Sequence, residues 1–334
     1  MTRERGLEIR DIPEPEAGPY GCLVEIDACA ICTGTDSNII RANFPGLPDP
    51  PFVLGHESTG IIRELGEKVG NFSIGQRVTR PAGVLPGERR SGIASVWGGF
   101  SELGIVVDTE AAVRDGVRYS SMAESSRRAL PPEVGPVWGA LSINQREIMS
   151  VVERLKVGLE SRCVVIGSGY NGLLFSLLLK RREAGRVLMV GSESRRELAT
   201  GTYGADRYLD YRRDHVPSEV RDLLEGEPTV VIDAVGTRAS VLFGESISGP
   251  GTAFGKYGMH EYDLTEEPLA RIGREHEILD LTTDEASATD EWLRLYRQDF
   301  FTDDMFDGTV PLEEIGLAFE RLARREAVKL VVTI

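Results

Sequence analysis

The stretch Gly167-Ser-Gly-Tyr-Asn-Gly172 constrains the fold of this chain more than any other part of its sequence. It directly follows an apolar strand pattern at residues 162–166 and opens an apolar helix pattern that runs to Arg182. Its glycines permit a tight turn, a close approach of the backbone to a pyrophosphate, and close packing of helix on strand. The helix N-terminus would stabilise the pyrophosphate charge. We therefore predict a dinucleotide-binding loop, the alternative being an ordinary strand-to-helix turn; its binding residues are Gly167, Gly169, Tyr170, Asn171 and Gly172.

Strand and helix patterns alternate through the second half of the chain. Strands are predicted at residues 186–191, 207–210, 229–236 and 251–257, with helices near 193–202 and 217–224. Such alternation predicts a parallel sheet with right-handed crossovers, which is a doubly wound α/β domain. Residues 5–110 instead show short period-two patterns broken by Gly and Pro, which predict an irregular antiparallel β domain.

Length and charge exclude several functional classes. A chain of 334 residues can bury two cores. Its formal net charge of −15 repels nucleic acid and anionic lipid, so neither is expected as a partner. No apolar run approaches the roughly 20 residues that span a bilayer, and the N-terminus has no signal-peptide pattern. Four cysteines are too few for a disulfide scaffold, so we expect a reducing, cytoplasmic environment.

The residues after the second predicted strand decide which dinucleotide fits. An acidic residue at that strand end binds the ribose hydroxyls of NAD, but here the strand ends at Gly191 and Ser192 follows. Guanidinium groups bind phosphate through a bidentate fork. We therefore predict that Ser192, Arg195 and Arg196 bind the 2′-phosphate of NADP. NAD stays possible, with both arginines solvated and Glu193 on the ribose.

A second group of residues predicts a metal site. Gly55-His56-Glu57 ends an apolar run, and Cys32 lies upstream. Sulfur, imidazole and carboxylate are all zinc ligands, and catalytic zinc takes three protein ligands and a water. We therefore predict a catalytic zinc held by Cys32, His56 and Glu57. Asp36 is expected to hold the His56 imidazole, and the Thr35 hydroxyl to pass a proton.

Other interpretations of this second group remain open. Cys29 and Cys32 form a Cys-x-x-Cys, which also occurs in redox pairs and in zinc knuckles. A knuckle needs a second cysteine pair, and Cys22 and Cys163 are not spaced as one. His56 and Glu57 can also simply end a buried strand.

The order of these motifs resembles the zinc-containing medium-chain dehydrogenase/reductases, the superfamily of alcohol, polyol and sugar dehydrogenases. The resemblance covers nearly the whole chain. It rests on Cys32 with Thr35-Asp36, Gly55-His56-Glu57, Gly75-Gln-Arg-Val78, Gly98-Gly-Phe-Ser-Glu102, Gly167 to Gly172, Asp233-Ala-Val-Gly236 and Val328-Lys-Leu-Val-Val332.

The resemblance implies a GroES-like catalytic domain at residues 1–130 and 285–334, and a Rossmann domain at 131–284. It implies hydride transfer between a nicotinamide and a carbinol or carbonyl carbon, with zinc as Lewis acid and Thr35 as proton relay. It also implies that Lys329 reaches the cofactor pyrophosphate, and that the chain forms a homodimer or homotetramer.

The chain departs from the family pattern in its metal ligands. Residues 81–100 lack the family's cysteine cluster, so we predict one catalytic zinc and no structural zinc. Gly139 stands where a helix normally offers a Cys or Glu ligand. Glu57 must then coordinate directly, or the zinc keeps extra water.

Together these features predict an NADP-dependent, zinc-assisted oxidoreductase acting on a small alcohol, polyol or ketone. One alternative is a zinc-poor relative that reduces an activated C=C or C=N bond. Another is a cofactor-binding pseudoenzyme.

Overall fold

A computed structural model describes residues 1, 6–85, 87–119, 128–261 and 263–334 of the chain. It divides into two compact units. The first unit holds Met1–Asn144 and Phe306–Ile334, and the second holds Gln145–Met305. Among the helices that the structure describes, none combines the length and apolar character needed to cross a bilayer.

These limits differ from the sequence-based boundaries at residues 130 and 285. The helix α4 (Pro136–Arg154) contributes residues to both units, because the division falls at Asn144. Residues 285–305 lie in the second unit, where the Trp292 indole is fully buried and donates to Oε1 of Gln145 at 2.7 Å. The charged composition around 285–305 hid this packing from sequence analysis.

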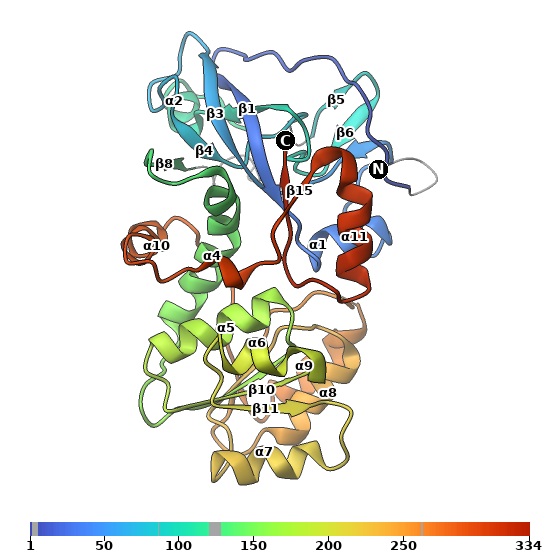
Figure 1. Cartoon of the computed structure of the whole chain (residues 1–334), viewed down its shortest axis with the longest axis vertical. Coiled ribbons are helices and arrows are strands. Elements are labelled where there is room, and N and C mark those ends of the chain that lie inside the picture. The colour runs from blue at the N-terminus through green and yellow to red at the C-terminus, as the bar shows by residue number, and fades with distance from the viewer. Residues whose placement is uncertain (2–5, 86, 120–127, 262) are drawn as a thin grey trace. The chain divides into compact units, whose positions relative to one another are not determined.

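A seven-stranded sheet dominates the first unit (Figure 1). Its order is β15-β16-β1-β3-β4-β8, with β7 also pairing with β1. The strands are β1 (Gly21–Ala30), β3 (Glu57–Leu65), β4 (Arg77–Thr79), β7 (Leu103–Val107), β8 (Ala129–Leu130), β15 (Thr309–Pro311) and β16 (Val331–Thr333). Because β16 pairs antiparallel with the end of β1, the C-terminal tail is part of this sheet.

Smaller elements complete the first unit. A three-stranded sheet contains β2 (Phe52–Val53), β5 (Arg89–Arg90) and β6 (Ile93–Ser95). Among the described residues of this unit, the helices are α1 (Thr35–Ile40), α2 (Thr109–Arg114), the start of α4, and α11 (Ile315–Ala323). Helix α11 buries Ile315, Ala318 and Leu322 against an apolar cluster that includes Ile31 and Leu330.

The second unit is a six-stranded parallel sheet of order β11-β10-β9-β12-β13-β14. Its strands are β9 (Arg162–Ile166), β10 (Arg186–Gly191), β11 (Arg207–Asp210), β12 (Val230–Asp233), β13 (Ala253–Lys256) and β14 (Glu277–Ile278). Strands buried on both faces read as continuous apolar runs, as β9 and β10 do. This strand order is that of the Rossmann fold, so that prediction is confirmed.

Helices connect these strands and cover both faces of the sheet. They are α5 (Tyr170–Arg181), α6 (Arg196–Thr200), α7 (Val216–Leu224), α8 (Arg238–Ile247), α9 (Glu266–Ile272) and α10 (Thr289–Tyr296). Figure 1 shows α5 and α6 on one side of the strands and α7 on the other. Residues of α7 and α8 pack on β9, β10 and β12 in one apolar cluster of this unit.

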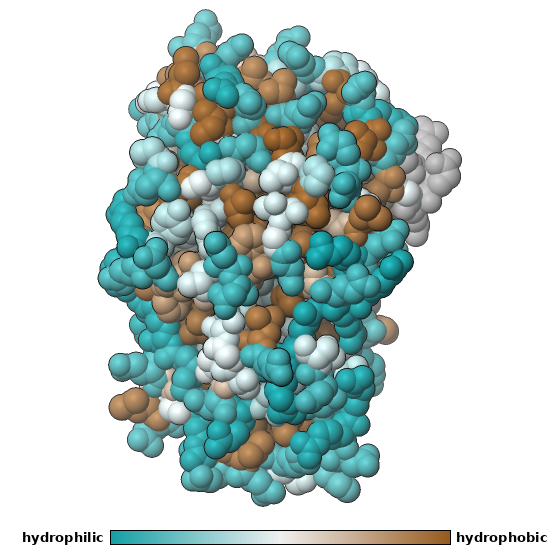
Figure 2. Space-filling model, viewed as in Figure 1, coloured by the Kyte–Doolittle hydropathy of each residue, from teal (hydrophilic) through white to brown (hydrophobic). Residues whose placement is uncertain are grey.

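The visible face of the molecule mixes hydrophilic and hydrophobic residues (Figure 2). Large exposed apolar side chains such as Ile74, Leu159 and Leu317 are far apart in the sequence. Single exposed apolar residues are ordinary for a folded protein and need no special explanation.

The pairing of β1 with β3 depends on Gly60. A Cβ at this position would lie 2.2 Å from the Glu25 carbonyl oxygen and 2.8 Å from Ile26 Cα. We therefore expect Gly60→Ala to lower the free energy of unfolding by about 2–3 kcal/mol, because the two strands must separate. Gly316→Ala is the matched control, since its Cβ meets nothing within 4 Å and alanine favours the helix. Urea unfolding of both variants measures the difference, and equal stability would contradict this account of the β1–β3 contact.

Candidate metal centre and dinucleotide loop

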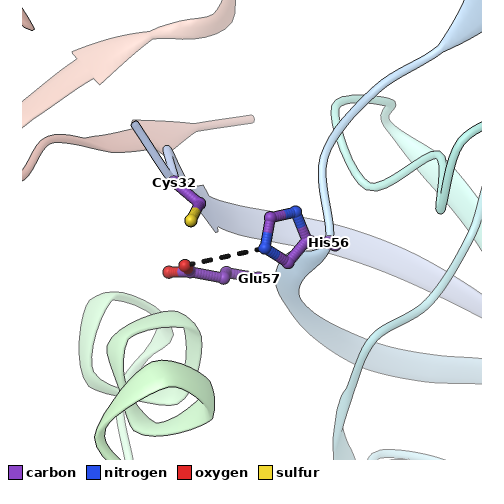
Figure 3. Close-up of side chains that lie close together, drawn as sticks. All are labelled: Cys32, His56 and Glu57. Carbon is purple, nitrogen blue, oxygen red and sulfur yellow. Dashed lines mark ion pairs between the residues drawn. The ribbon is translucent and has the colours of Figure 1, made fainter. Parts of the chain in front are cut away.

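Three predicted ligands meet at one end of the first unit's main sheet. Ala30, the last residue of β1, pairs with Glu57, the first residue of β3. Cys32 follows β1 by two residues and His56 precedes β3 by one, so the pairing brings all three together. One ligand atom from each of Cys32, His56 and Glu57 lies within 4.8 Å of the other two (Figure 3).

The donor set fits a zinc ion. Zinc binds sulfur at about 2.3 Å, and nitrogen or oxygen at about 2.0–2.2 Å, so its ligand atoms lie roughly 3–4 Å apart. Oε1 of Glu57 is 3.8 Å from Nε2 of His56. The same Oε1 is fully buried and accepts no hydrogen bond from any group that the structure describes. A buried carboxylate oxygen without a donor is costly unless a cation satisfies it.

Asp36 orients two of the three candidate ligands. Its Oδ1 lies 3.4 Å from Nδ1 of His56, within ion-pair distance, although neither atom has a hydrogen-bond partner among the described residues, so its holding of the imidazole stays a prediction. Its Oδ2 accepts a hydrogen bond from the Cys32 backbone N–H at 2.9 Å, which sequence analysis missed. Because Nδ1 faces Asp36, Nε2 is left to face Cys32 and Glu57. A carboxylate behind the imidazole is the usual support for a metal-binding histidine.

The surroundings of His56 also set its charge in the metal-free protein. Burial opposes protonation, but the neighbouring Asp36 carboxylate and Cys32 outweigh it and raise the pKa of His56 well above its usual range. A metal bound to this imidazole would therefore compete with the proton that the raised pKa favours.

Two further residues hold His56 and were not predicted. The Trp97 indole lies 5.2 Å from the imidazole, centroid to centroid, and meets the Phe44 ring edge-on. Trp97 has a φ of 64°, a conformation that is strained for a bulky residue. Nη1 of Arg80 donates to the His56 carbonyl oxygen at 2.6 Å. Neither residue lies near His56 in the sequence, so only the fold reveals them.

Cys29 does not join the candidate ligands. It is fully buried, and burial raises the pKa of its thiol well above the usual range. All four cysteines are free thiols. A thiol that stays protonated is a poor nucleophile, so the structure does not favour a redox pair of Cys29 with Cys32.

The remaining predicted residues of this unit lie nearby in sequence or space. Thr35 is the first residue of α1 and is buried. The Lys329 ammonium lies on Oε2 of Glu57 at 2.5 Å, and both side chains are almost completely buried. The resemblance had implied a contact of Lys329 with the cofactor pyrophosphate, and that contact stays a prediction.

Gly139 is a packing position of α4. A Cβ there would lie 2.9 Å from Oγ1 and 3.1 Å from Cγ2 of Thr59. The Thr59 hydroxyl is itself engaged, since it donates to the Val78 carbonyl at 2.9 Å. A ligand-bearing side chain at residue 139 would therefore displace Thr59.

The predicted dinucleotide loop has the required geometry in the second unit. Gly167 follows β9 and has a φ of 107°, which favours glycine. A Cβ on Gly172 would lie 2.0 Å from the Gly167 carbonyl oxygen, so the helix start packs directly on the turn. A Cβ on Gly169 would meet nothing within 4 Å, which leaves its backbone open to a ligand.

Tyr170 and Asn171 begin the helix that follows this loop. The Tyr170 side chain is buried, and its hydroxyl accepts a hydrogen bond from Nε2 of Gln145 at 3.1 Å. Asn171 is half-buried. Tyr170 therefore anchors α5 within the second unit, a role that sequence analysis did not identify.

The residues after β10 form a dense polar group. Arg196 donates to both carboxylate oxygens of Glu193, at 2.6 and 2.8 Å, and to the Tyr208 carbonyl at 2.8 Å. The Ser192 backbone N–H donates to the Ser168 hydroxyl at 3.1 Å, and Arg195 is half-buried in the same turn. The two groups that favoured different cofactors, Glu193 and Arg196, thus bind one another.

The chain is similar to known dehydrogenases in sequence and in fold. Residues 18–114 match the model of the alcohol dehydrogenase GroES-like domain. A sorbitol dehydrogenase of Bombyx mori is 27% identical over 239 residues, which cover 69% of this chain and 67% of that protein. An NADP-dependent isopropanol dehydrogenase of Thermoanaerobacter brockii is 27% identical over 235 residues, covering 69% and 66%. The solved alcohol dehydrogenase TADH from Thermus sp. ATN1 shares the fold, with a TM-score of 0.80, 20% identity and coverage of 100% and 98%.

The role of Asp36 can be tested through the pH dependence of metal binding. In the wild-type protein, zinc affinity should fall as the pH drops through the raised pKa of His56. In Asp36→Asn that pKa falls, so the midpoint of this dependence should move to lower pH. The affinity at alkaline pH should drop about 10- to 100-fold, because the imidazole loses its orienting carboxylate. Zinc competition with a chromophoric chelator across the pH range measures both effects.

The exposed Asp49 supplies the control for this measurement, since Asp49→Asn removes a charge from the same unit at its surface. An unchanged pH profile in Asp36→Asn would show that Asp36 does not act on the imidazole.

Proposed function

Because the chain belongs to the zinc-containing medium-chain dehydrogenase/reductase superfamily, we propose that it is an NADP-dependent, zinc-assisted oxidoreductase of a small alcohol, polyol or ketone. Membership makes it a dehydrogenase-type oxidoreductase of small molecules. The observation that carries the zinc proposal is the convergence of Cys32, His56 and Glu57 around a buried carboxylate oxygen without a donor.

The charges of the site support a divalent cation. Cys32 binds metal as a thiolate, and Asp36 and Glu57 add two buried carboxylates. Lys329 is the cation in contact with Glu57. With a neutral His56, these groups leave an excess of two negative charges, which one zinc ion balances.

The proposal gives each candidate residue a role. Zinc, when bound, supplies a Lewis acid for the substrate oxygen, and the nicotinamide supplies or accepts hydride. Cys32, His56 and Glu57 hold the metal, and Asp36 keeps the His56 imidazole turned toward it. Thr35 passes the proton of the substrate hydroxyl, because a threonine hydroxyl both donates and accepts.

The second unit is proposed to bind the cofactor. Gly167, Gly169, Tyr170, Asn171 and Gly172 contact the dinucleotide, and the Tyr170 side chain also holds the start of α5 in place. Ser192, Arg195 and Arg196 bind the 2′-phosphate of NADP. To do so, Arg196 gives up its hydrogen bonds to Glu193 and donates to the phosphate instead. Support for NADP comes from these guanidinium groups and from the cofactor named for the Thermoanaerobacter brockii relative.

The proposed cellular location and oligomeric state are based on the free cysteines and on the family. We propose a cytoplasmic homodimer or homotetramer, supported by the four free thiols and by the assembly expected of the family.

One observation favours a second candidate function. The Glu57 carboxylate already forms an ion pair with Lys329. The charge of Glu57 would therefore stay compensated in a protein that binds no zinc. Such a protein would reduce an activated C=C or C=N bond without metal, or bind the cofactor only. The metal content of the purified protein separates these candidates from the first.

Metal content gives the direct test of the zinc site. Protein purified with zinc present should contain about one zinc ion per chain, as a single catalytic site requires. Cys32→Ser should lose most of that zinc and most of the turnover, because the thiolate ligand is gone. Cys29→Ser is the matched control from the same Cys-x-x-Cys and should keep its zinc. Elemental analysis measures the zinc content, and an alcohol oxidation assay measures the turnover. A full complement of zinc in Cys32→Ser would refute this ligand set.

Cofactor choice tests the polar group after β10. We expect NADPH to bind more tightly than NADH. Arg195→Gln should weaken NADPH binding about tenfold or more while leaving NADH binding nearly unchanged, since a charge-assisted hydrogen bond contributes about 1.5–3 kcal/mol. Arg207→Gln, at an exposed arginine of β11, is the control. Fluorescence titration of the three proteins with NADPH and with NADH measures these affinities, and tight NADH binding with no NADPH binding would contradict the assignment.

A further inference from the structure

The buried pair of Lys329 and Glu57 uses only one oxygen of the carboxylate. The Lys329 ammonium contacts Oε2, while Oε1 is directed toward His56 and has no donor among the described residues. Burying two charges is expensive, and a pair of this kind adds little stability by itself. The pair fixes which oxygen of Glu57 is left toward Cys32 and His56.

Asp307 holds Lys329 in this position through the backbone. Its Oδ2 accepts from the Val328 N–H at 2.6 Å and from the Lys329 N–H at 3.0 Å. Its own N–H donates to the Lys329 carbonyl at 2.7 Å. The next residue, Leu330, accepts at its carbonyl from the Ile31 N–H at 3.0 Å, directly before Cys32. The Lys329 backbone is therefore fixed on one side by Asp307 and on the other by the strand end that carries Cys32.

This fixation matters because a lysine side chain is long and flexible. Its rotamer freedom opposes any single position, and anchoring the backbone reduces the space that the ammonium can reach. Asp307 itself is solvent-exposed and touches none of the three candidate ligands in the described contacts. Its three bonds to residues 328 and 329 reach the site only through Lys329.

We propose that Asp307 is a positioning residue of the metal centre. By fixing the Lys329 backbone, it holds the ammonium on Oε2 of Glu57, so that Glu57 binds the metal through Oε1 alone. The inference rests on the proposed zinc site, and it adds an exposed residue of the tail that acts through Lys329. It also explains how Glu57 serves as third ligand where Thr59 closes the Gly139 position.

Zinc affinity in a double-mutant cycle tests the proposal. Lys329→Met should weaken zinc binding about 10- to 100-fold, the usual loss when a supporting partner of a ligand is removed. Asp307→Ala should weaken it about tenfold. In the combined variant, Asp307→Ala should add nothing to Lys329→Met, because Asp307 acts through Lys329. Competition with a chromophoric chelator measures each affinity on the full-length protein.

Conservative variants and a second readout separate positioning from general stability. Asp307→Asn keeps an oxygen acceptor and Lys329→Arg keeps the cation, so both should bind zinc nearly as the wild type does. Glu313→Gln, an exposed acid of the same tail, should also be unchanged. The visible spectrum of Co²⁺ bound in place of zinc reports the number of ligands. It should change in Asp307→Ala and Lys329→Met and stay constant in these three controls.

The outcomes distinguish this inference from the proposed function. A wild-type protein that takes up neither zinc nor Co²⁺ would refute the metal site and the inference with it. A metal-binding wild type whose affinity and Co²⁺ spectrum persist in Asp307→Ala would refute the inference alone. The inference alone would also be refuted if Asp307→Ala weakened zinc binding as much in the Lys329→Met variant as it does in the wild type. If Asp307→Ala does not fold, Lys329→Met against Lys329→Arg still tests the ammonium.

Discussion

The antiparallel pairing of β1 with β3 is the constraint on which the candidate metal site depends. Register places Ala30 opposite Glu57, so Cys32 and His56 arrive at the same edge from separate parts of the chain. A slip of one residue would turn every side chain to the opposite face. Close contact at Gly60 and the apolar cluster around Val24, Ile62 and Val78 hold this register. The strands thereby set the ligand positions before any metal contributes.

The C-terminal tail adds a second, independent hold on the same place. β16 pairs with the last residues of β1. The Leu330 carbonyl accepts a hydrogen bond from the N–H of Ile31, the residue before Cys32. Lys329 thus reaches Glu57 from a segment 272 positions away in the sequence. Asp36, in α1, also contacts two of the candidate ligands. Its Oδ1 faces His56, and its Oδ2 accepts a hydrogen bond from the Cys32 backbone N–H. The β1–β3 pairing, the C-terminal tail and Asp36 of α1 therefore all fix the candidate metal site, through backbone and carboxylate contacts.

Sequence patterns predicted the central strands of the second unit because β9 and β10 are buried on both faces and read as apolar runs. The runs at Arg186–Gly191 and Arg207–Asp210 were predicted at their observed limits, and the Gly167–Gly172 loop was placed between the correct strand and helix. Helices α8, α9 and α10 were not predicted. In α9 and α10, charged residues mask the few buried positions, such as Trp292. The candidate ligands were found because Cys, His and Glu carry recognisable chemistry. Trp97, Arg80 and Asp307 were not, because their partners lie far away in the sequence and only folding brings them together.

The contact between Gly139 and Thr59 has a consequence for how such a site changes over evolutionary time. A single mutation to Cys or Glu at position 139 meets Thr59 at 2.9 Å and does not restore a helix ligand. Thr59 must shrink as well, which gives up its bond to the Val78 carbonyl. We therefore expect the effects of changes at positions 59 and 139 to depend on each other. A gradual change of this site is therefore expected to act through Glu57 and the residues that contact it, and not through position 139 alone.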